Sequence, residues 1–336
     1  MKLYAISLEP LSGFGTQLKG DTLFGHFCWQ AAYDPKLLNG GLDKWINCYG
    51  EKPCVVFSSA VPYFSGQSTP YAVKRPDLPR SCLFRNDAAQ QSKREQMEAR
   101  KKNNKKKWML LEKSLVMDLK KSLYRTDADL AGMVAGVNPS NDFQCSFEQP
   151  HNTINRLTLT TGEGAFAPFE ETVHFYTPGT ELALFVLVDE AATDLERICT
   201  ALERMGQFGY GKNASTGLGR FRLGSLPEEV SRPSNQACNA CYALAPVVPE
   251  KGMFSKAFFQ PFVRFGKHGD QLARSAHPFK NPVIMADEGA VFMPAKEEVF
   301  LKPYIGTAVR NTSKAMKTAV VQGYAPYLPF RLEDNP

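Results

Sequence analysis

Residues 206–219 read GQFGYGKNASTGLG, so five glycines share one short stretch with a lysine, an asparagine, a serine and a threonine. Glycine adopts positive φ angles that a Cβ disfavours, so successive backbone N–H groups in such a loop can turn toward one point. A nest of this kind accepts phosphate oxygens. The side chains of Lys212, Asn213 and Ser215 would add further donors. The stretch therefore predicts a phosphate-binding loop, and the question is which phosphates it binds.

A nucleotide is one answer, because residues 206–212 have the spacing of a P-loop. However, Asn213 stands where Ser or Thr would hold Mg²⁺, and a P-loop follows a strand and opens a helix. Here a helical pattern over residues 194–205 comes before the loop, and residues 218–223 alternate like a strand after it. This order disfavours an NTPase. A flexible turn is the simplest alternative, and we favour the binding of an extended polyanion.

Composition limits the class of protein. The chain has 336 residues, enough for about two domains, with 43% hydrophobic and 22% charged residues. Its net charge of +6 is a moderate basic bias that is compatible with nucleic acid. No apolar run approaches the roughly 18 residues of a membrane span, and residues 1–9 are too short and too soon acidic for a signal peptide. We expect a cytoplasmic protein that does not enter membranes.

The eight cysteines are scattered along the chain, which indicates reduced thiols. Cys238 and Cys241 form the one close pair, and a zinc site would need a second pair or nearby histidines at suitable spacing. We therefore expect no metal and no cofactor.

The first part of the chain has a β–α–β pattern. Residues 2–9 predict a strand that is apolar on both faces and hence central in its sheet. A helix over residues 20–32 follows, with Asp21 or Thr22 as its cap, and residues 53–61 predict the next strand.

The same order recurs later in the chain. Residues 181–188 predict a strand, and a helix over residues 194–205 follows, capped by Thr193 or Asp194 and ended by Gly206. A strand after the glycine-rich stretch closes the unit. We therefore predict an α+β protein built from two ferredoxin-like modules, a topology that is also the scaffold of RNA-recognition motifs.

A long insertion separates the two passes, from about residue 63 to about residue 147. Residues 93–107 within it are dense in lysine and arginine, with only Glu95 and Glu98 to oppose them. Such a run is typical of a mobile, solvated surface segment, and it would equally suit a segment that follows a phosphate backbone. Residues 108–121 predict a short helix after it.

Catalysis is the rival to binding. His26 lies in the first predicted helix and is the candidate general base of a metal-independent ribonuclease. A base needs an orienting partner, and no carboxylate lies at helical spacing from it, which favours a structural histidine. Residues 151–161 are instead rich in donors, including Asn152 and Arg156, which suit phosphates, sugars and base edges. A capped turn leading into a strand is the alternative for that segment.

The order of several motifs resembles a known family. The motifs are GDTLFG at residues 20–25, KRPDLP at 74–79, a lysine-rich run ending at Trp108, HNTINR at 151–156, GYGKNASTGLGRF at 209–221, EGAVF at 288–292 and GYAPYLP at 323–329. Together they cover essentially the whole chain. This arrangement resembles the fourth subunit of the type III-A CRISPR (Csm) effector complex, in the RAMP superfamily.

The resemblance implies two ferredoxin-like RAMP domains, one over residues 1–150 with the basic insertion and one over residues 151–336 with the glycine-rich loop. It implies an RNA-binding subunit that is not a nuclease. Such subunits bind the repeat-derived 5′ tag of the crRNA and cap one end of the complex. They contact the large cyclase/HD-nuclease subunit and a repeated backbone subunit, and they push a hairpin into the guide–target RNA duplex.

The resemblance also implies which residues contact RNA. In the glycine-rich loop these are Gly209, Gly211, Lys212, Asn213, Ser215, Gly217, Gly219 and Arg220, and elsewhere they are Lys19, Lys74, Arg75, Asn152 and Arg156. The basic insertion would follow the RNA backbone through Arg100, Lys101, Lys102, Lys105, Lys106 and Lys107. The chain departs from the family pattern at His151, Asn155 and Ala290, where Arg, Asp and Ser are usual.

Two alternatives stay open. One is a related RAMP endoribonuclease that processes crRNA precursor with His26 as its base. The other is a scaffold whose RNA contacts are incidental.

Overall fold

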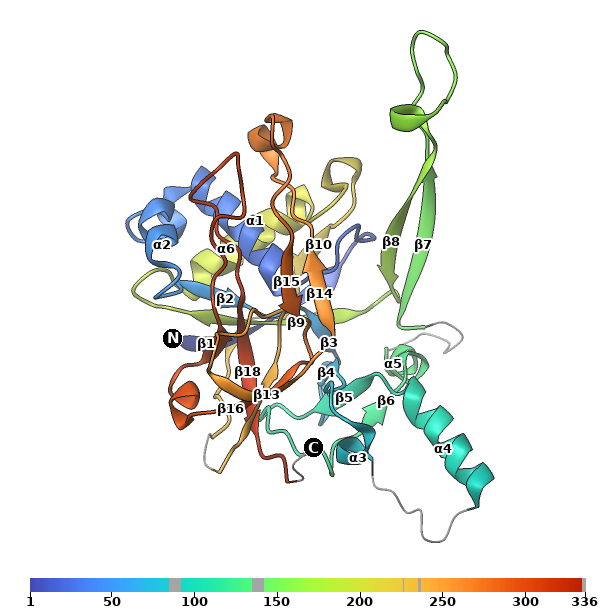
Figure 1. Ribbon diagram of the computed structural model, residues 1–336, viewed down its shortest axis with the longest axis vertical. Coiled ribbons are helices and arrows are strands. Elements are labelled where there is room, and N and C mark those ends of the chain that lie inside the picture. Colours follow the sequence, from blue (N-terminus) through green and yellow to red (C-terminus); the bar gives the residue numbers. More distant parts are fainter. Residues whose placement is uncertain (85–91, 135–141, 226, 235–236, 334–336) are drawn as a thin grey trace.

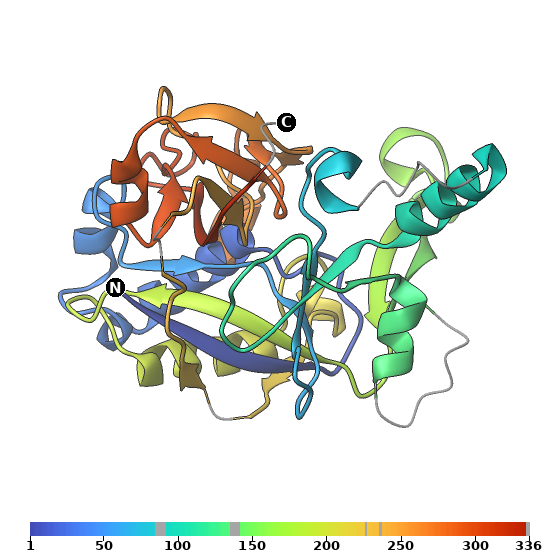
Figure 2. The same ribbon diagram turned by 90° about the horizontal axis from the view of Figure 1, so that it is seen from below.

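The computed structural model describes residues 1–84, 92–134, 142–225, 227–234 and 237–333. Helices and sheets are mixed, which confirms the α+β class. Figure 2 shows the residues after 240, in orange and red, gathered on one side of the blue and green strands of the first sheet. A long hairpin projects away from both (Figure 1).

The first sheet has nine strands, and all of its pairings are antiparallel. They are β1 (Lys2–Pro10), β2 (Val55–Phe57), β3 (Val61–Tyr63), β4 (Tyr71–Lys74), β5 (Trp108–Leu111), β6 (Tyr124–Arg125), β9 (Glu181–Val188), β10 (Phe221–Leu223) and β11 (Glu228–Glu229). β1 pairs with β9 on one side and with β10 and β11 on the other. Its predicted central position is confirmed.

The two β–α–β passes share this one sheet. In the order β10-β1-β9-β3, strands of the first and second passes alternate, and β2 also pairs with β9. Helices α1 (Gly20–Tyr33) and α6 (Leu195–Phe208) contact each other and the sheet. The result is a β–α–β–β–α–β order, which is that of a single ferredoxin-like unit.

The prediction that each pass forms its own module is therefore wrong. The reason is that β1 finds its longest partner in β9, far along the chain. The pairing crosses residue 150, the boundary expected between two domains, and residue 150 itself lies within strand β7 (Gln144–His151).

Both predicted helices are present, but the observed cap of α1 and the observed end of α6 differ from the predictions. The predicted caps of α1, Asp21 and Thr22, lie inside the helix, whose N-cap is Lys19 without a side-chain hydrogen bond. The carboxylate of Asp21 is instead bound by Arg264 at 2.5 and 3.0 Å. Asp194 does cap α6, as one of the two predicted caps, by accepting a hydrogen bond from the backbone N–H of Arg197. However, α6 continues past Gly206 to Phe208.

The strand predicted over residues 53–61 is split into β2 and β3. Between them, the Ser58 hydroxyl accepts a hydrogen bond from the backbone N–H of Phe185 at 2.9 Å. A side chain thus replaces a backbone acceptor in the ladder at this point, which interrupts the regular strand pairing.

The insertion is folded in its described part. It contains β4 to β6 and the helices α3 (Arg80–Leu83), α4 (Lys93–Lys105) and α5 (Asp127–Met133). The basic run predicted to be mobile forms α4, which starts with a capping box between Ser92 and Glu95. The helix predicted over residues 108–121 is wrong, because Trp108–Leu111 pairs with β4 and Leu115 has a φ of 55°.

The second sheet has five strands in the order β13-β16-β12-β18-β17. Their bounds are β12 (Ala240–Ala243), β13 (Phe254–Phe258), β16 (Val291–Pro294), β17 (Tyr304–Gly306) and β18 (Tyr324–Phe330), and a separate ribbon pairs β14 (Pro261–Arg264) with β15 (Val283–Ala286). Residues 237–333 contain short 3-10 turns but no α-helix. The helix of the predicted second domain is α6, which packs on the first sheet, so residues 237–333 form no ferredoxin-like unit of their own.

Buried polar groups connect the two sheets. The side-chain amide of Gln322, just before β18, donates to the backbone oxygen of Phe57 at 2.7 Å and accepts from its N–H at 3.0 Å. This amide is fully buried and mimics the missing backbone of a neighbouring strand. One hydrophobic core also spans both sheets.

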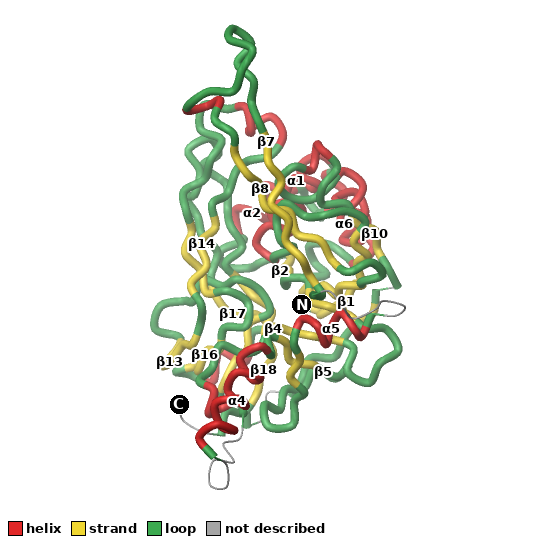
Figure 3. The backbone as a smooth tube through the Cα atoms, turned by 90° about the vertical axis from the view of Figure 1, so that its right-hand side faces the viewer, coloured by secondary structure: helices red, strands yellow, loops and turns green. Residues whose placement is uncertain are grey.

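The projecting hairpin consists of β7 and β8 (Phe169–Tyr176), which pair along their full length. Its tip, residues 152–168, lies far from the body of the protein (Figures 1 and 3). Three apolar side chains there are more than half exposed: Ile154, Leu157 and Leu159. The short α2 (Leu42–Cys48) lies at the other side of the protein.

Candidate nucleic-acid interface

The glycine-rich loop, residues 209–219, follows α6 and leads into β10. Gly209, Gly211, Gly217 and Gly219 all have positive φ, and Asn213 is left-handed with φ of 62°. At Gly219 a Cβ would lie 2.0 Å from the backbone oxygen of Tyr210, so no side chain fits. The loop therefore needs glycine for both backbone conformation and close packing, as the sequence pattern predicted.

The loop is held against residues 11–19. The hydroxyl of the fully buried Tyr210 donates to the backbone oxygen of Gln17 at 3.0 Å. The backbone N–H of Lys212 donates to the Thr16 hydroxyl at 3.0 Å, and that of Gly219 donates to the Gly13 oxygen at 2.8 Å. These contacts fix the loop in one shape while the side chains of Lys212, Ser215 and Arg220 stay exposed.

His26 lies beneath the loop. Its Nε2 atom accepts a hydrogen bond from the backbone N–H of Gly211 at 3.1 Å, and its ring centroid is 4.8 Å from that of Tyr210. Burial lowers the pKa of His26 to about 4, so the ring is neutral near neutral pH. The lone pair that a general base would use is thus occupied by the loop.

The loop meets the hairpin at Glu171, near the outer end of the β7–β8 ladder. The carboxylate of Glu171, in β8, accepts from Lys212 Nζ at 2.7 Å and from the side-chain amide of Asn213. The Nε2 atom of His151 lies 3.7 Å away from it. The hydrogen bond from Lys212 holds the pKa of Glu171 below its ordinary value, so the carboxylate is ionised at neutral pH. Nothing in the sequence pointed to Glu171, because the partners lie on elements far apart in the chain.

Lys19 and Lys74 occupy a buried ion cluster rather than an open surface. Lys19 Nζ lies 2.5 Å from Asp287 and 2.7 Å from Glu288, and Lys74 Nζ lies 3.2 Å from Asp287. Burial opposes ionisation, but the bonds from Glu288 and the two lysines lower the pKa of Asp287 to about 2. Burial instead raises the pKa of Glu288. These lysines connect the two sheets.

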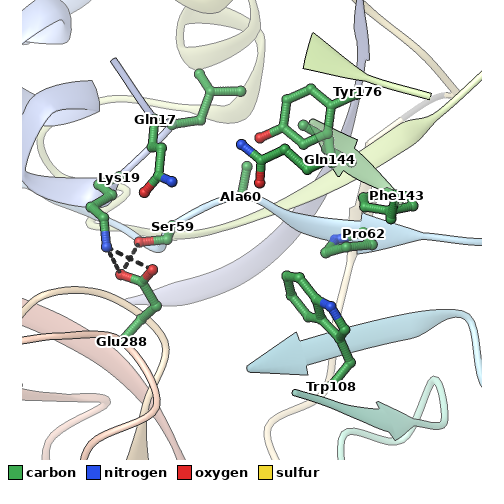
Figure 4. A pocket seen from close by; sticks show the side chains of 12 residues that line it. Gln17, Lys19, Ser59, Ala60, Pro62, Trp108, Phe143, Gln144, Tyr176 and Glu288 are labelled. Atoms are coloured by element: carbon green, nitrogen blue, oxygen red, sulfur yellow. Dashed lines mark hydrogen bonds and ion pairs between the residues drawn. The ribbon is translucent and has the colours of Figure 1, made fainter. Parts of the chain in front are cut away.

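A small polar cavity of about 100 Å³ lies beside this cluster. Figure 4 shows Lys19 and Ser59 turned toward Glu288 at one end, with Gln144 and Tyr176 at the other. The Nε2 atom of Gln144 is buried and has no hydrogen-bond partner among the described residues. Sequence patterns gave no sign of this cavity, because its walls come from the first sheet, the hairpin and the turn at Glu288, which are far apart in the chain.

Arg75 serves the basic helix. Its Nη1 atom donates to the backbone oxygens of Asn103 at 3.0 Å and Lys106 at 2.9 Å, at the C-terminal end of α4, where carbonyls lack the full set of helical partners. Arg100, Lys101, Lys102 and Lys105 are exposed along α4. The last two basic residues are engaged: Lys106 lies over the Phe84 ring, and Lys107 pairs with Asp127 at 2.7 Å.

The remaining predicted residues lie in the tip segment of the hairpin. Asn152, which directly follows His151, and Arg156 are exposed there. The structure thus brings together the glycine-rich loop and His151, while α4 and the hairpin tip form separate surfaces.

Two further properties concern the described residues alone. Among them, no three His, Cys, Asp or Glu side chains are grouped so as to hold a metal ion. The same residues include no helix that is both long and apolar enough to span a bilayer. All eight cysteines are free thiols.

No protein-family model and no curated protein matches this sequence. Solved structures match it over its whole length. One is a chain in the crystal structure of a Csm1–Csm4 cassette in complex with pppApA, with a TM-score of 0.55, 14% identity, and coverage of 99% of this chain and 98% of that chain. Another is a chain in the crystal structure of a Csm3–Csm4 subcomplex in the type III-A CRISPR–Cas interference complex. It has a TM-score of 0.55, 11% identity, and coverage of 98% and 100%. At these identities the likeness establishes the fold: this chain has the fold of a chain found in type III-A Csm assemblies.

Proposed function

We propose that this chain is a non-catalytic, RNA-binding subunit of a type III-A CRISPR–Cas interference complex. In this role it binds the repeat-derived 5′ tag of the crRNA. It also links the large cyclase/HD-nuclease subunit to a repeated backbone subunit, and its hairpin meets the duplex of guide and target RNA.

The observation that carries this proposal is the fold match along nearly all of both chains. A match of this extent includes the insertion and the hairpin as well as the common ferredoxin-like unit. Fold alone does not define function, so the site must supply the rest of the support.

The chemistry of the site fits single-stranded RNA. The fixed glycine-rich loop presents Lys212, Ser215 and Arg220 to solvent, and α4 presents a row of exposed cations. Positively charged grooves and loops that follow a phosphate backbone are the usual means of holding single strands. The position of His26 supports a non-catalytic role, since its Nε2 atom already accepts from Gly211.

The test is purification of the tagged chain with its co-expressed genomic neighbours, followed by sequencing of the bound RNA and mass spectrometry of the proteins. We expect uniform small RNAs that share one repeat-derived 5′ end, and a large cyclase-type partner. Recovery of cleaved repeat fragments with the chain alone would favour the ribonuclease instead, and His26→Ala should then abolish cleavage.

A matched pair of variants links the result to the loop. Replacement of Lys212 and Arg220 by alanine should reduce the RNA recovered per assembly. Replacement of the exposed Lys251 and Lys314 by alanine removes the same charge elsewhere and should leave the amount of bound RNA unchanged. If both pairs retain the RNA while the protein partners stay bound, the chain acts as a scaffold.

A further inference from the structure

The contact between Glu171 and the glycine-rich loop has the form of an occupied anion site. Three donor groups converge on one carboxylate: Lys212 Nζ at 2.7 Å, the Asn213 amide, and His151 Nε2 at 3.7 Å. The carboxylate is largely shielded, with 12% of its side chain exposed, whereas that of Lys212 is 53% exposed. The site is therefore reachable from solvent on the side of the lysine.

The set of donors exceeds what a carboxylate anchor requires. The Nε2 atom of His151 is buried and makes no hydrogen bond to any described residue, although it faces Glu171. The His151 ring is fixed there by stacking on Phe169, with centroids 5.4 Å apart. An unpartnered buried nitrogen beside a lysine and an amide suits an anion with more acceptor oxygens than a carboxylate offers.

We propose that Lys212, Asn213 and His151 form a phosphodiester-binding site for RNA, which Glu171 occupies as an internal competitor when RNA is absent. The inference rests on the proposed RNA-binding function and deepens it, because it names a phosphate contact and the residue that regulates it. A phosphodiester has two non-bridging oxygens that share one negative charge, as a carboxylate does, and two bridging ester oxygens besides, so it can satisfy the same donors and His151 as well.

The same contact connects the site to the hairpin. Glu171 is in β8, paired with Gln149 of β7, near the outer end of the ladder and close to the tip segment. Entry of a phosphate removes the ion pair between the glycine-rich loop and the hairpin. RNA binding at the loop therefore frees the outer part of β8, while the backbone hydrogen bonds between Phe14 and His174 still hold the base of the hairpin. The contact with Glu171 lowers the apparent affinity for RNA, because only the molecules in which it is open can bind the phosphate.

The experiment measures binding of a fluorescein-labelled single-stranded RNA of about ten nucleotides to the full chain by anisotropy. Glu171→Gln keeps the shape of the side chain and removes its charge. It should bind the RNA about threefold to tenfold more tightly than the unaltered protein, as expected for loss of a partly shielded competing ion pair. Glu170→Gln is the matched control, because Glu170 is the neighbouring exposed residue of β8 and forms no ion pair with the residues that the structure describes. It removes the same charge and should change binding less than twofold.

A double-mutant cycle identifies the competitor's partner. Lys212→Ala should weaken RNA binding more in the Glu171→Gln background than in the unaltered protein, since only there is Lys212 free of Glu171. Thermal unfolding of each variant shows whether it is folded. If Glu171→Gln does not fold, Glu171→Asp keeps the charge but is one methylene shorter, and it should bind RNA more tightly than the unaltered protein.

Equal or weaker RNA binding by the folded Glu171 variants would overturn the proposal and leave Glu171 as an anchor of the hairpin. Failure of the proposed function gives a different result: the unaltered protein would bind no labelled RNA, and its assemblies would contain no crRNA.

Discussion

The backbone N–H of Gly211 donates a hydrogen bond to Nε2 of His26 across 3.1 Å, which ties the glycine-rich loop to helix α1. The bond requires a neutral imidazole, and burial lowers the pKa of His26 to about 4. His26, the candidate general base of the sequence analysis, thus holds the glycine-rich loop in place. Its protonation state is therefore linked to the stability of the folded protein.

We expect His26 to make the protein less stable in acid. Its pKa is about 4 in the folded chain and 6.5 when unfolded, so between these values the unfolded chain binds more protons. The free energy of unfolding therefore rises with pH across this window, by a total of about 3 kcal/mol from His26. Above pH 6.5 His26 adds no further pH dependence. His26→Gln keeps an acceptor for Gly211 and should lose this component. Urea unfolding at pH values of about 4.5 and 7 measures it, and an equal pH dependence in both proteins would contradict the prediction.

Gly206→Ala should destabilise the protein although Gly206 lies within helix α6. A Cβ there would lie 2.1 Å from the backbone oxygen of Phe221, so α6 and β10 would have to separate. We expect a loss of about 2–3 kcal/mol in the free energy of unfolding. Gly25→Ala in α1 is the matched control, since no atom lies within 4 Å of its Cβ. It should stabilise by up to about 1 kcal/mol, the gain in helix propensity.

Lys19→Met should be strongly destabilising, because it leaves Asp287 and Glu288 buried without their shared cation. Burial disfavours the charged lysine, yet these carboxylates outweigh it and raise the pKa of Lys19. Removal of one partner of a buried ion pair costs about 3–5 kcal/mol. Lys52→Met removes an exposed ion pair with Asp189 and should cost less than about 1 kcal/mol. Similar losses in the two variants, measured by urea unfolding, would refute this distinction.

The exposed cations of α4 should set the salt dependence of RNA binding. Alanine at Arg100, Lys101, Lys102 and Lys105 is expected to reduce the slope of log K against log salt by about 3, since each phosphate contact on a single strand contributes about 0.7. The slope is measured by anisotropy with single-stranded RNA at several salt concentrations. Alanine at four other exposed lysines, Lys251, Lys296, Lys314 and Lys317, removes the same charge and should leave the slope unchanged. Equal slopes for the two sets would show that α4 is only a solvated surface.

Local chemistry was predictable from the sequence where neighbouring residues decide it. The strand over Glu181–Val188 was predicted at its observed bounds, because the seven apolar residues that follow Glu181 place apolar side chains on both faces, as in a buried strand. The helical stripe of α6 and its Asp194 cap were likewise predictable. So was the glycine-rich loop, because residues with positive φ must be glycine wherever a backbone approaches as closely as Tyr210 approaches Gly219.

Tertiary structure decided everything that depends on residues far apart in the chain. Pairing of β1 with β9 joined two predicted modules into one sheet, and pairing of Trp108–Leu111 with β4 replaced a predicted helix by a strand. Lys19 was predicted at an RNA surface and is buried, because Asp287 and Glu288, over 260 residues away, neutralise it. The partnership of Lys212 with Glu171 arises in the same way. Sequence patterns determine periodicity, caps and turns, whereas charge partners and burial are set only once distant strands have found their register.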